Sequence, residues 1–176
     1  MIGNAINKLY MASSEKRLEC FLYNCSEVQA EGRDFWPIFT EMWNMCDSTW
    51  EYRNAVLKLL RKHAKTRPTC DRREDEMAFY NELPERITVY RGCSKMRQRG
   101  LAWTTERGVA EGFAKGLRQI EVPEPVVLKC VVPKSVVLTT FAYARQESEV
   151  LLDYLRLPRI MSICLVGGER RMPLES

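Results

Sequence analysis

The sequence predicts an α+β protein in which a helical N-terminal lobe, residues 1–83, packs on a β-rich half, residues 84–176, and the two form one compact domain. Apolar residues recur at helical spacing through about the first eighty positions. After Pro84 the period changes to the alternation and β-branched runs of strands. With 45% hydrophobic and 28% charged side chains among 176 residues, the chain is long enough to bury a sizeable core.

Four helices are expected in the N-terminal lobe, each from an apolar face with spacings of three and four residues. The first carries this face over residues 18–28, and the second follows Pro37. The third opens with a capping box that starts at Ser48, and it closes at His63, which we expect to be a cation favoured by the helix dipole. The fourth spans residues 71–82.

The β-rich half is expected to contain one helix among its strands. The helix is predicted over residues 106–115, with Gly116 as its C-terminal stop. β-Branched and apolar runs predict strands over residues 86–91, 126–132, 148–152 and 160–166.

The cysteine and histidine content limits the chemistry. Seven cysteines are an odd number without any C-x-x-C pair, so we expect reduced thiols and a cytoplasmic setting. A single histidine excludes an H-E-x-x-H site, and we expect a metal-free protein. No segment reaches membrane-spanning length and the N-terminus has no signal-type apolar run, so no membrane partner is expected.

Basic residues gather between Arg53 and Arg73, although the net charge is only +4. This basic stripe leaves open an acidic or nucleic-acid-associated partner. A solvated helix face and linker is the simpler interpretation, because no aromatic side chains interleave with the cations as they do in a stacking platform for bases.

Three polar motifs follow one another in the β-rich half. Arg91-Gly92 ends a β-branched strand, Trp103-Thr104-Thr105 precedes the helix, and Glu147-Ser148-Glu149 opens an apolar strand. Because side chains alternate along a strand, Glu147 and Glu149 are expected to point the same way. Two like charges together at the edge of an apolar run are costly to hold and suggest a site.

The first two motifs contain residue types suited to a nucleotide substrate. Arg91 offers a planar fork for phosphate oxygens, and Gly92 allows the backbone to approach a ligand closely. One of the hydroxyls of Thr104 and Thr105 is expected to cap the following helix. Taken alone, an edge-strand arginine in an ion pair and a turn glycine would be the simpler interpretation. No G-x-G-x-x-G or P-loop motif is present, which disfavours a dehydrogenase or a P-loop enzyme.

In this order, the motifs resemble those of the Arg/Ser-Thr-Ser/Glu-x-Glu class of mono-ADP-ribosyltransferases, and the resemblance covers residues 84–166. It implies the split, mostly antiparallel sheet of that family, with NAD as co-substrate. It also implies transfer of ADP-ribose to a side chain of a target protein, with release of nicotinamide. Small members without secretion sequences resemble phage, prophage or toxin-module enzymes that act on a host protein in the host-cell cytoplasm.

The resemblance also implies a role for each motif. Glu149 would bind the 2′-hydroxyl of the nicotinamide ribose and stabilise the oxocarbenium ion, while Glu147 would orient and help deprotonate an acceptor arginine. Arg91 would organise NAD, and the backbone at Gly92 would grip the nicotinamide amide. Phe113 corresponds to an aromatic residue that packs against the nicotinamide, although its helical spacing alone favours a core residue.

The middle motif departs from the family at its first position. Thr104 and Thr105 would scaffold the site and hold the catalytic glutamate, but Trp103 stands where a serine is usual. Trp103 is either a stacking wall for nicotinamide or adenine, or a core tryptophan. Two other function classes stay open: a non-catalytic module of the same fold that inhibits a host complex, and a nucleic-acid-binding or nucleic-acid-modifying protein that uses the basic stripe.

Overall fold

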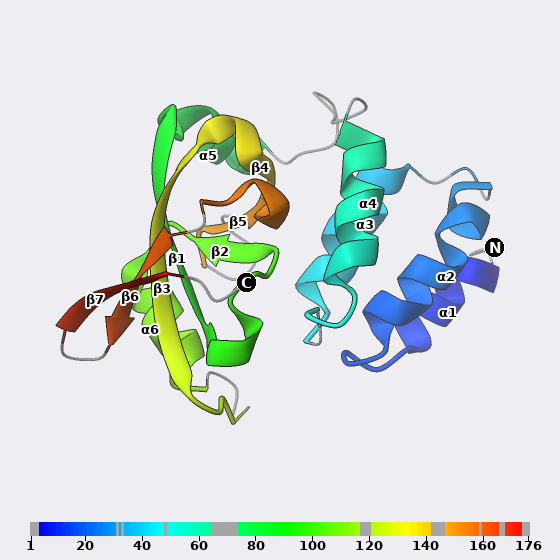
Figure 1. Ribbon diagram of the computed structural model, residues 1–176. Helices are drawn as coiled ribbons and strands as arrows, with labels where there is room; N and C mark the ends of the chain where they lie inside the picture. Colours follow the sequence, from blue (N-terminus) through cyan, green and yellow to red (C-terminus); the bar gives the residue numbers. More distant parts are fainter. Residues whose placement is uncertain are drawn as a thin grey trace. The chain divides into compact units, whose positions relative to one another are not determined.

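The chain divides into two compact units, Met1–Arg73 and Glu74–Ser176 (Figure 1). The division falls at 73/74 rather than at the expected 83/84, so the helix α5 (Glu74–Glu82) belongs to the unit that contains the strands. That the two units form one compact domain stays a prediction. The computed structural model describes residues 4–30, 32, 34–47, 49–64, 74–116, 121–141, 147–158, 160–165 and 168–173.

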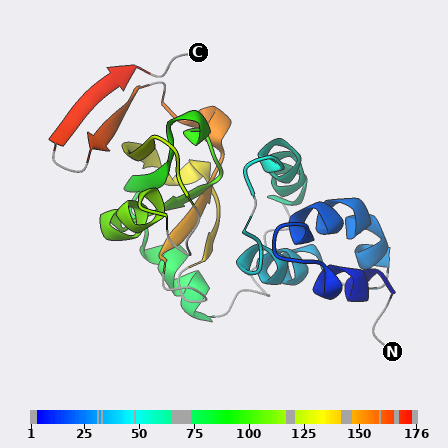
Figure 2. The ribbon, with the colours of Figure 1, turned by 90° about the horizontal axis from the view of Figure 1, so that it is seen from below.

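The first unit is helical, as predicted. Its helices are α1 (Asn4–Met11), α2 (Arg17–Ala30), α3 (Phe35–Asn44) and α4 (Arg53–His63), and Figure 2 shows them from a second side. The short helix α1 was not expected. Helix α3 begins two residues before Pro37, because a proline is tolerated in the first turn, where backbone N–H groups have no partner within the helix. Helix α4 begins at Arg53 with Tyr52 as its N-cap, five residues after the expected start, and Ser48 itself lies outside the described residues.

Aromatic packing and the hydrogen bonds of Arg17 hold the helices of this unit together. Phe21 of α2 and Phe39 of α3 are 1% and 0% exposed, with ring centroids 6.0 Å apart. The Arg17 guanidinium donates to the carbonyl oxygens of Ala12, at 2.6 Å, and Met45, at 2.8 Å, so it satisfies acceptors just beyond the ends of α1 and α3.

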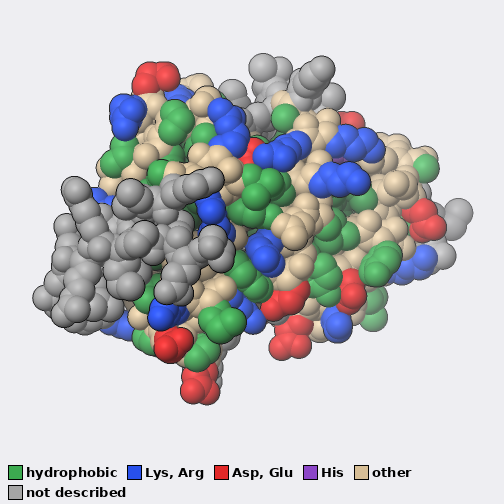
Figure 3. Space-filling view, in the orientation of Figure 1, with side chains coloured by type: hydrophobic (Ala, Val, Ile, Leu, Met, Phe, Trp, Pro, Cys, Tyr) green, Lys and Arg blue, Asp and Glu red, His purple; other side chains and the backbone are tan. Residues whose placement is uncertain are grey.

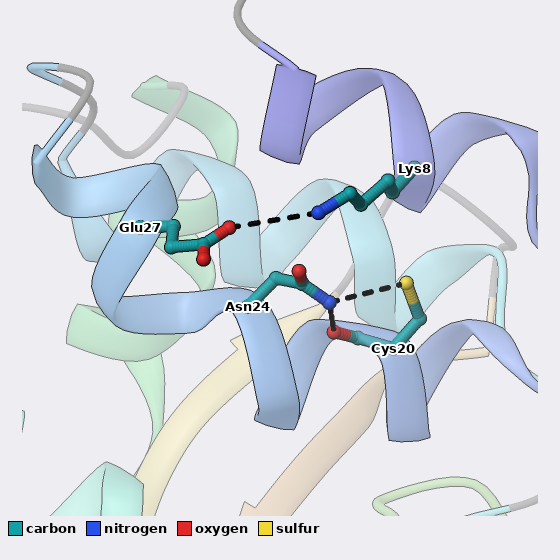
Figure 4. Close-up of polar contacts among 4 residues, drawn as sticks. All are labelled: Lys8, Cys20, Asn24 and Glu27. Atoms are coloured by element: carbon teal, nitrogen blue, oxygen red, sulfur yellow. Dashed lines mark hydrogen bonds and ion pairs between the residues drawn. The ribbon is translucent and has the colours of Figure 1, made fainter.

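Polar contacts on the surface of α1 and α2 add little to this packing. Lys8 Nζ lies 3.7 Å from a carboxylate oxygen of Glu27, and both side chains are exposed (Figure 4). Asn24 donates to the carbonyl oxygen of Cys20, one turn back along α2, at 2.7 Å, and the same view draws this bond. An exposed ion pair of this kind contributes about 0–1 kcal/mol, so the apolar core dominates the stability of the unit.

His63 is not the cation that the sequence predicted. Its ring stacks on Phe35, with centroids 3.9 Å apart and an interplanar angle of 11°. Burial, and secondarily the positive charge of Lys62, lower the pKa of His63. Both causes disfavour the imidazolium, so the cation that we expected at the end of α4 is not favoured.

We expect the first unit to lose stability as the pH falls below about 6.5, since the unfolded histidine then takes up a proton that the folded ring resists. A depressed folded pKa stabilises the fold above the unfolded pKa, and this contribution is lost as the pH falls through the folded pKa. Urea unfolding at about pH 7.5 and about pH 5.5 measures this change in the free energy of unfolding. His63→Phe keeps an aromatic ring on Phe35 and should show a smaller pH dependence; identical dependences would contradict the assignment.

The second unit contains a seven-stranded, entirely antiparallel sheet in the order β4-β5-β2-β1-β3-β6-β7. The predicted α+β class is thus confirmed. Three strands were not predicted: β2, β4 and β7. The strands are β1 (Arg86–Ser94), β2 (Ala102–Thr104), β3 (Pro125–Pro133), β4 (Val137–Phe141), β5 (Glu149–Leu152), β6 (Ile160–Leu165) and β7 (Gly168–Pro173).

The sheet is weakly joined at its middle. Among the described residues, β1 pairs with β3 over the whole of Arg86–Ser94, whereas the register between β1 and β2 consists of the pair Tyr90–Thr104. Strands β4, β5 and β2 therefore form one half of the sheet, and β1, β3, β6 and β7 form the other. After β1 the chain leaves through the 3-10 turn Lys95–Arg97 before it returns as β2.

Helix α6 (Arg107–Ala114) packs on one face of this sheet (Figure 1). Ala110 and Ala114 form a buried cluster with Val127 of β3, and Tyr90 packs against it. Gly116, with φ +85°, ends the helix as predicted. Among the described residues, no helix is both long and apolar enough to cross a membrane.

Candidate active site

A row of polar side chains crosses the sheet on the face where α6 packs. Glu149 is the register partner of Thr104, which pairs with Tyr90, which in turn pairs with Lys129 of β3. Directly opposite residues of antiparallel strands share a face. Glu149, Tyr90 and Lys129 are half-buried, and Thr104 is 5% exposed. This face therefore combines a carboxylate, a phenol and an ammonium group along one line.

The second and third motifs lie together, although 43 positions separate Thr104 from Glu147. Thr104 Oγ1 donates to the carbonyl oxygen of Glu147 at 2.7 Å, and the N–H of Thr105 donates to the carbonyl oxygen of Ser148 at 3.2 Å. The Ser148 hydroxyl donates to Glu106 Oε1. Three hydrogen bonds thus join the segment that leads into Glu149 to three consecutive residues, Thr104, Thr105 and Glu106, at the end of β2 and before α6.

The threonines do not cap α6, contrary to the prediction. The N-cap is Glu106, which has extended backbone and makes no side-chain cap bond. Thr104 Oγ1 instead accepts a hydrogen bond from the N–H of Glu106 at 3.0 Å while it donates to Glu147. The hydroxyl is therefore used as both donor and acceptor to join the two motifs, and it is not available to the helix.

The Glu147–Glu149 segment is not a continuous strand. Ser148 has φ +43°, in the left-handed region, and β5 begins only at Glu149. A non-glycine residue in this conformation costs about 1–2 kcal/mol. The expected alternation through Ser148 was wrong, so the shared direction of Glu147 and Glu149 does not follow from a strand period. What the structure retains is the proximity of both residues to Thr104 and Thr105.

Arg91 does not lie in the polar row. It neighbours Tyr90 in β1, so its side chain leaves the sheet on the opposite face. Its Nε and Nη2 donate to the carbonyl oxygen of Arg97 at 3.3 Å, and Nη1 donates to that of Ala102 at 2.5 Å. A Cβ on Gly100 would overlap this guanidinium. Arg91 therefore holds the connection from β1 to β2 in the described structure.

The remaining predicted residues have clear packing environments. Trp103 is 2% exposed and donates from Nε1 to the carbonyl oxygen of Gly100 at 3.0 Å, so the structure favours the core tryptophan over the stacking wall. A Cβ on Gly92 would overlap the carbonyl oxygen of Ala110, so this glycine admits α6 onto the sheet. Phe113 is half-buried on α6.

Four residues of this region escaped the sequence reasoning: Glu106, Ser148, Tyr90 and Lys129. Glu106 directly follows the threonines, and Ser148 is the middle residue of the third motif, but the sequence gives neither residue a role of its own. Tyr90 and Lys129 are placed in the row with Glu149 by the pairing of the strands, which cannot be predicted from their own sequence segments. An antiparallel pairing of β1 with β2 would have to be known before their place beside Glu149 could be inferred.

The basic stripe is only partly described, since residues 65–73 lie outside the described residues. Lys58, Arg61 and Lys62 are exposed on α4, and the Arg53 guanidinium carbon lies 3.9 Å from the centre of the Trp50 ring. Figure 3 shows Lys and Arg side chains exposed at several places on the face that is drawn, some of them next to one another. These observations favour a solvated helix face.

None of the thiols with described side chains is in a disulfide, and most of them are buried. Cys25, Cys46, Cys93 and Cys130 are buried, and burial raises the pKa of Cys130 to about 12. Such a thiol is a poor nucleophile because its thiolate is strongly disfavoured. Cys70 and Cys164 lie outside the described side chains, so the full reduction of all seven cysteines stays a prediction. Among the described residues, no three His, Cys, Asp or Glu side chains lie together in a group that could hold a metal ion.

Comparisons of this chain with protein-family models, with curated proteins and with solved structures find no match.

Proposed function

We propose that this protein is an NAD-dependent mono-ADP-ribosyltransferase that modifies an arginine of a target protein in a bacterial cytoplasm. The observation that carries the proposal is the set of hydrogen bonds from Thr104 and Thr105 to the segment ending at Glu149. A scaffold of this kind is what the resemblance implies for the middle motif. The narrow junction between β1 and β2 supports a split sheet, and the proposal assigns the second unit to the ADP-ribosyltransferase fold.

The chemistry proposed for the two glutamates needs no other catalytic group. The bond between C1′ of the ribose and the nicotinamide nitrogen breaks, and its electron pair leaves with nicotinamide. The Glu149 carboxylate stabilises the positive charge that develops at C1′, as carboxylates do in glycoside hydrolysis. A guanidinium nitrogen of the acceptor then forms the new bond to C1′ and gives up a proton through Glu147.

The test uses NAD labelled in its adenylate half. The protein is incubated with this NAD and a bacterial lysate, labelled proteins are identified by mass spectrometry, and nicotinamide release is measured in parallel. We expect nicotinamide release together with transfer of the label to an arginine. Absence of nicotinamide release both with and without lysate would contradict the proposal, and a label on another residue type would contradict the arginine specificity.

Arg91→Lys is expected to lower both NAD affinity and stability, because an ammonium group cannot donate to the carbonyls of Arg97 and Ala102 in the geometry of the fork. The expected loss of unfolding free energy is about 1–3 kcal/mol. Calorimetry with NAD and urea unfolding measure the two effects. Arg86→Lys, an exposed position of the same strand, is the control. Reduced affinity with unchanged stability would indicate direct contact with phosphate, whereas unchanged affinity with reduced stability would limit Arg91 to the loop.

A non-catalytic module of the same fold is the second candidate function. It is favoured by two observations: Arg91 bonds to backbone carbonyls on the face away from Glu149, and Trp103 is buried. Both residues then serve packing, and the chain would bind and inhibit a host complex without NAD. Calorimetry separates the candidates, since this second function requires that NAD does not bind.

A further inference from the structure

Glu106 and Ser148 form a hydrogen-bonded pair, and the resemblance to the family gives neither residue a role. The Ser148 hydroxyl donates to the Glu106 carboxylate, and the backbone at Ser148 is left-handed with φ +43°. Hydrogen bonds to a charged acceptor are stronger than those between neutral groups. This bond joins the residue before α6 to the residue before β5, and it therefore restrains a serine in a backbone conformation that L-residues rarely adopt.

Different contacts fix the two glutamates on either side of this turn. Glu149 is part of β5 and pairs with Thr104 and Phe141, so the sheet sets its backbone. Glu147 precedes the left-handed residue, so the direction in which it lies relative to β5 depends on the φ angle of Ser148 as well as on the hydrogen bond from Thr104 Oγ1 to its carbonyl oxygen. Loss of the left-handed turn would therefore displace Glu147 and leave Glu149 in place.

We propose that Glu106 and Ser148 are positioning residues for Glu147, because they hold the turn that directs its carboxylate to the acceptor. The inference rests on the proposed transferase function and deepens it. The pair controls transfer to the acceptor and not cleavage of NAD, since cleavage depends on Glu149. A glycine at position 148 adopts a positive φ without a side-chain bond, so Ser148→Gly should make Glu106 dispensable.

The conformational part of the inference is tested without activity. Backbone carbon chemical shifts report the sign of φ at residue 148 in the wild type, in Glu106→Ala and in Glu106→Ala/Ser148→Gly. We expect a positive φ in the wild type and in the double variant, and its loss in Glu106→Ala. A positive φ retained in Glu106→Ala would overturn the pairing. Glu111→Ala is the control, because Glu111 is a carboxylate of α6 that pairs with Arg107 at 2.8 Å.

The functional part compares NAD hydrolysis with transfer to an arginine-containing peptide. In Glu106→Ala, transfer should fall about 10- to 100-fold, the effect of misplacing a reacting group by about 1 Å. NAD hydrolysis should stay within about threefold of the wild type, and Ser148→Gly in this background should restore transfer. Equal loss of both activities, or no rescue, would refute the positioning role. If the wild type cleaves no NAD, the proposed function fails instead. The chemical shifts alone then test whether Glu106 holds the left-handed turn at Ser148.

Discussion

Glu149→Gln should reduce both ADP-ribose transfer and NAD hydrolysis about 100-fold or more, because in the proposed mechanism it removes the charge that faces C1′ in the transition state. The change removes little volume, and the backbone of Glu149 stays paired with Thr104 and Phe141. The fold should therefore be retained. Initial rates of nicotinamide release and of peptide labelling, measured beside a thermal melt, test the expectation.

Glu121→Gln is the matched control, since Glu121 is an exposed glutamate of the same unit. It should leave both rates unchanged. If Glu149→Gln keeps near-normal rates and an unchanged melt, Glu149 is not the catalytic carboxylate. A loss of rate with a lowered melting temperature would instead trace the defect to the junction of β5 with β2.

The fold class could be predicted because the two periodicities are strong. The face over residues 18–28 is buried in α2, and the predicted strands at 86–91 and 126–132 lie in β1 and β3. Strand β2 has three residues and α1 has eight, so neither is long enough to establish a period. The boundary of α3 moved because Pro37 fits the first turn of a helix.

The candidate site could be predicted as a set of motifs but not as a geometry. The sequence motifs predict that Thr104 and Glu149 belong to one site, and in the structure the two residues are register partners in β2 and β5. The left-handed φ of Ser148 has no sequence signal, because glycine or asparagine is the usual residue in that region. The direction of Arg91 depends on the register in which β1 pairs with its neighbours, and a shift of that register by one residue would reverse it.

Gly92→Ala should destabilise the second unit. A Cβ at this position would overlap the carbonyl oxygen of Ala110 and lie 2.7 Å from the backbone nitrogen of Ala114. Because these are backbone atoms of α6, relief requires the helix to move away from β1. Overpacking of this kind costs about 1–3 kcal/mol. Urea unfolding of the purified variant measures the loss.

Gly108→Ala, a change within α6 itself, should have the opposite effect on stability. An added Cβ there meets nothing within 4 Å, and alanine favours a helix over glycine by about 1 kcal/mol. Gly108→Ala should therefore be as stable as the wild type or more stable. Gly92→Ala should also affect the site. Thr104 ends β2 shortly before α6 begins, so displacement of α6 should weaken the hydrogen bond from Thr104 to Glu147 and lower transferase activity. Equal stability of the two variants would show that α6 does not pack on β1 at Gly92.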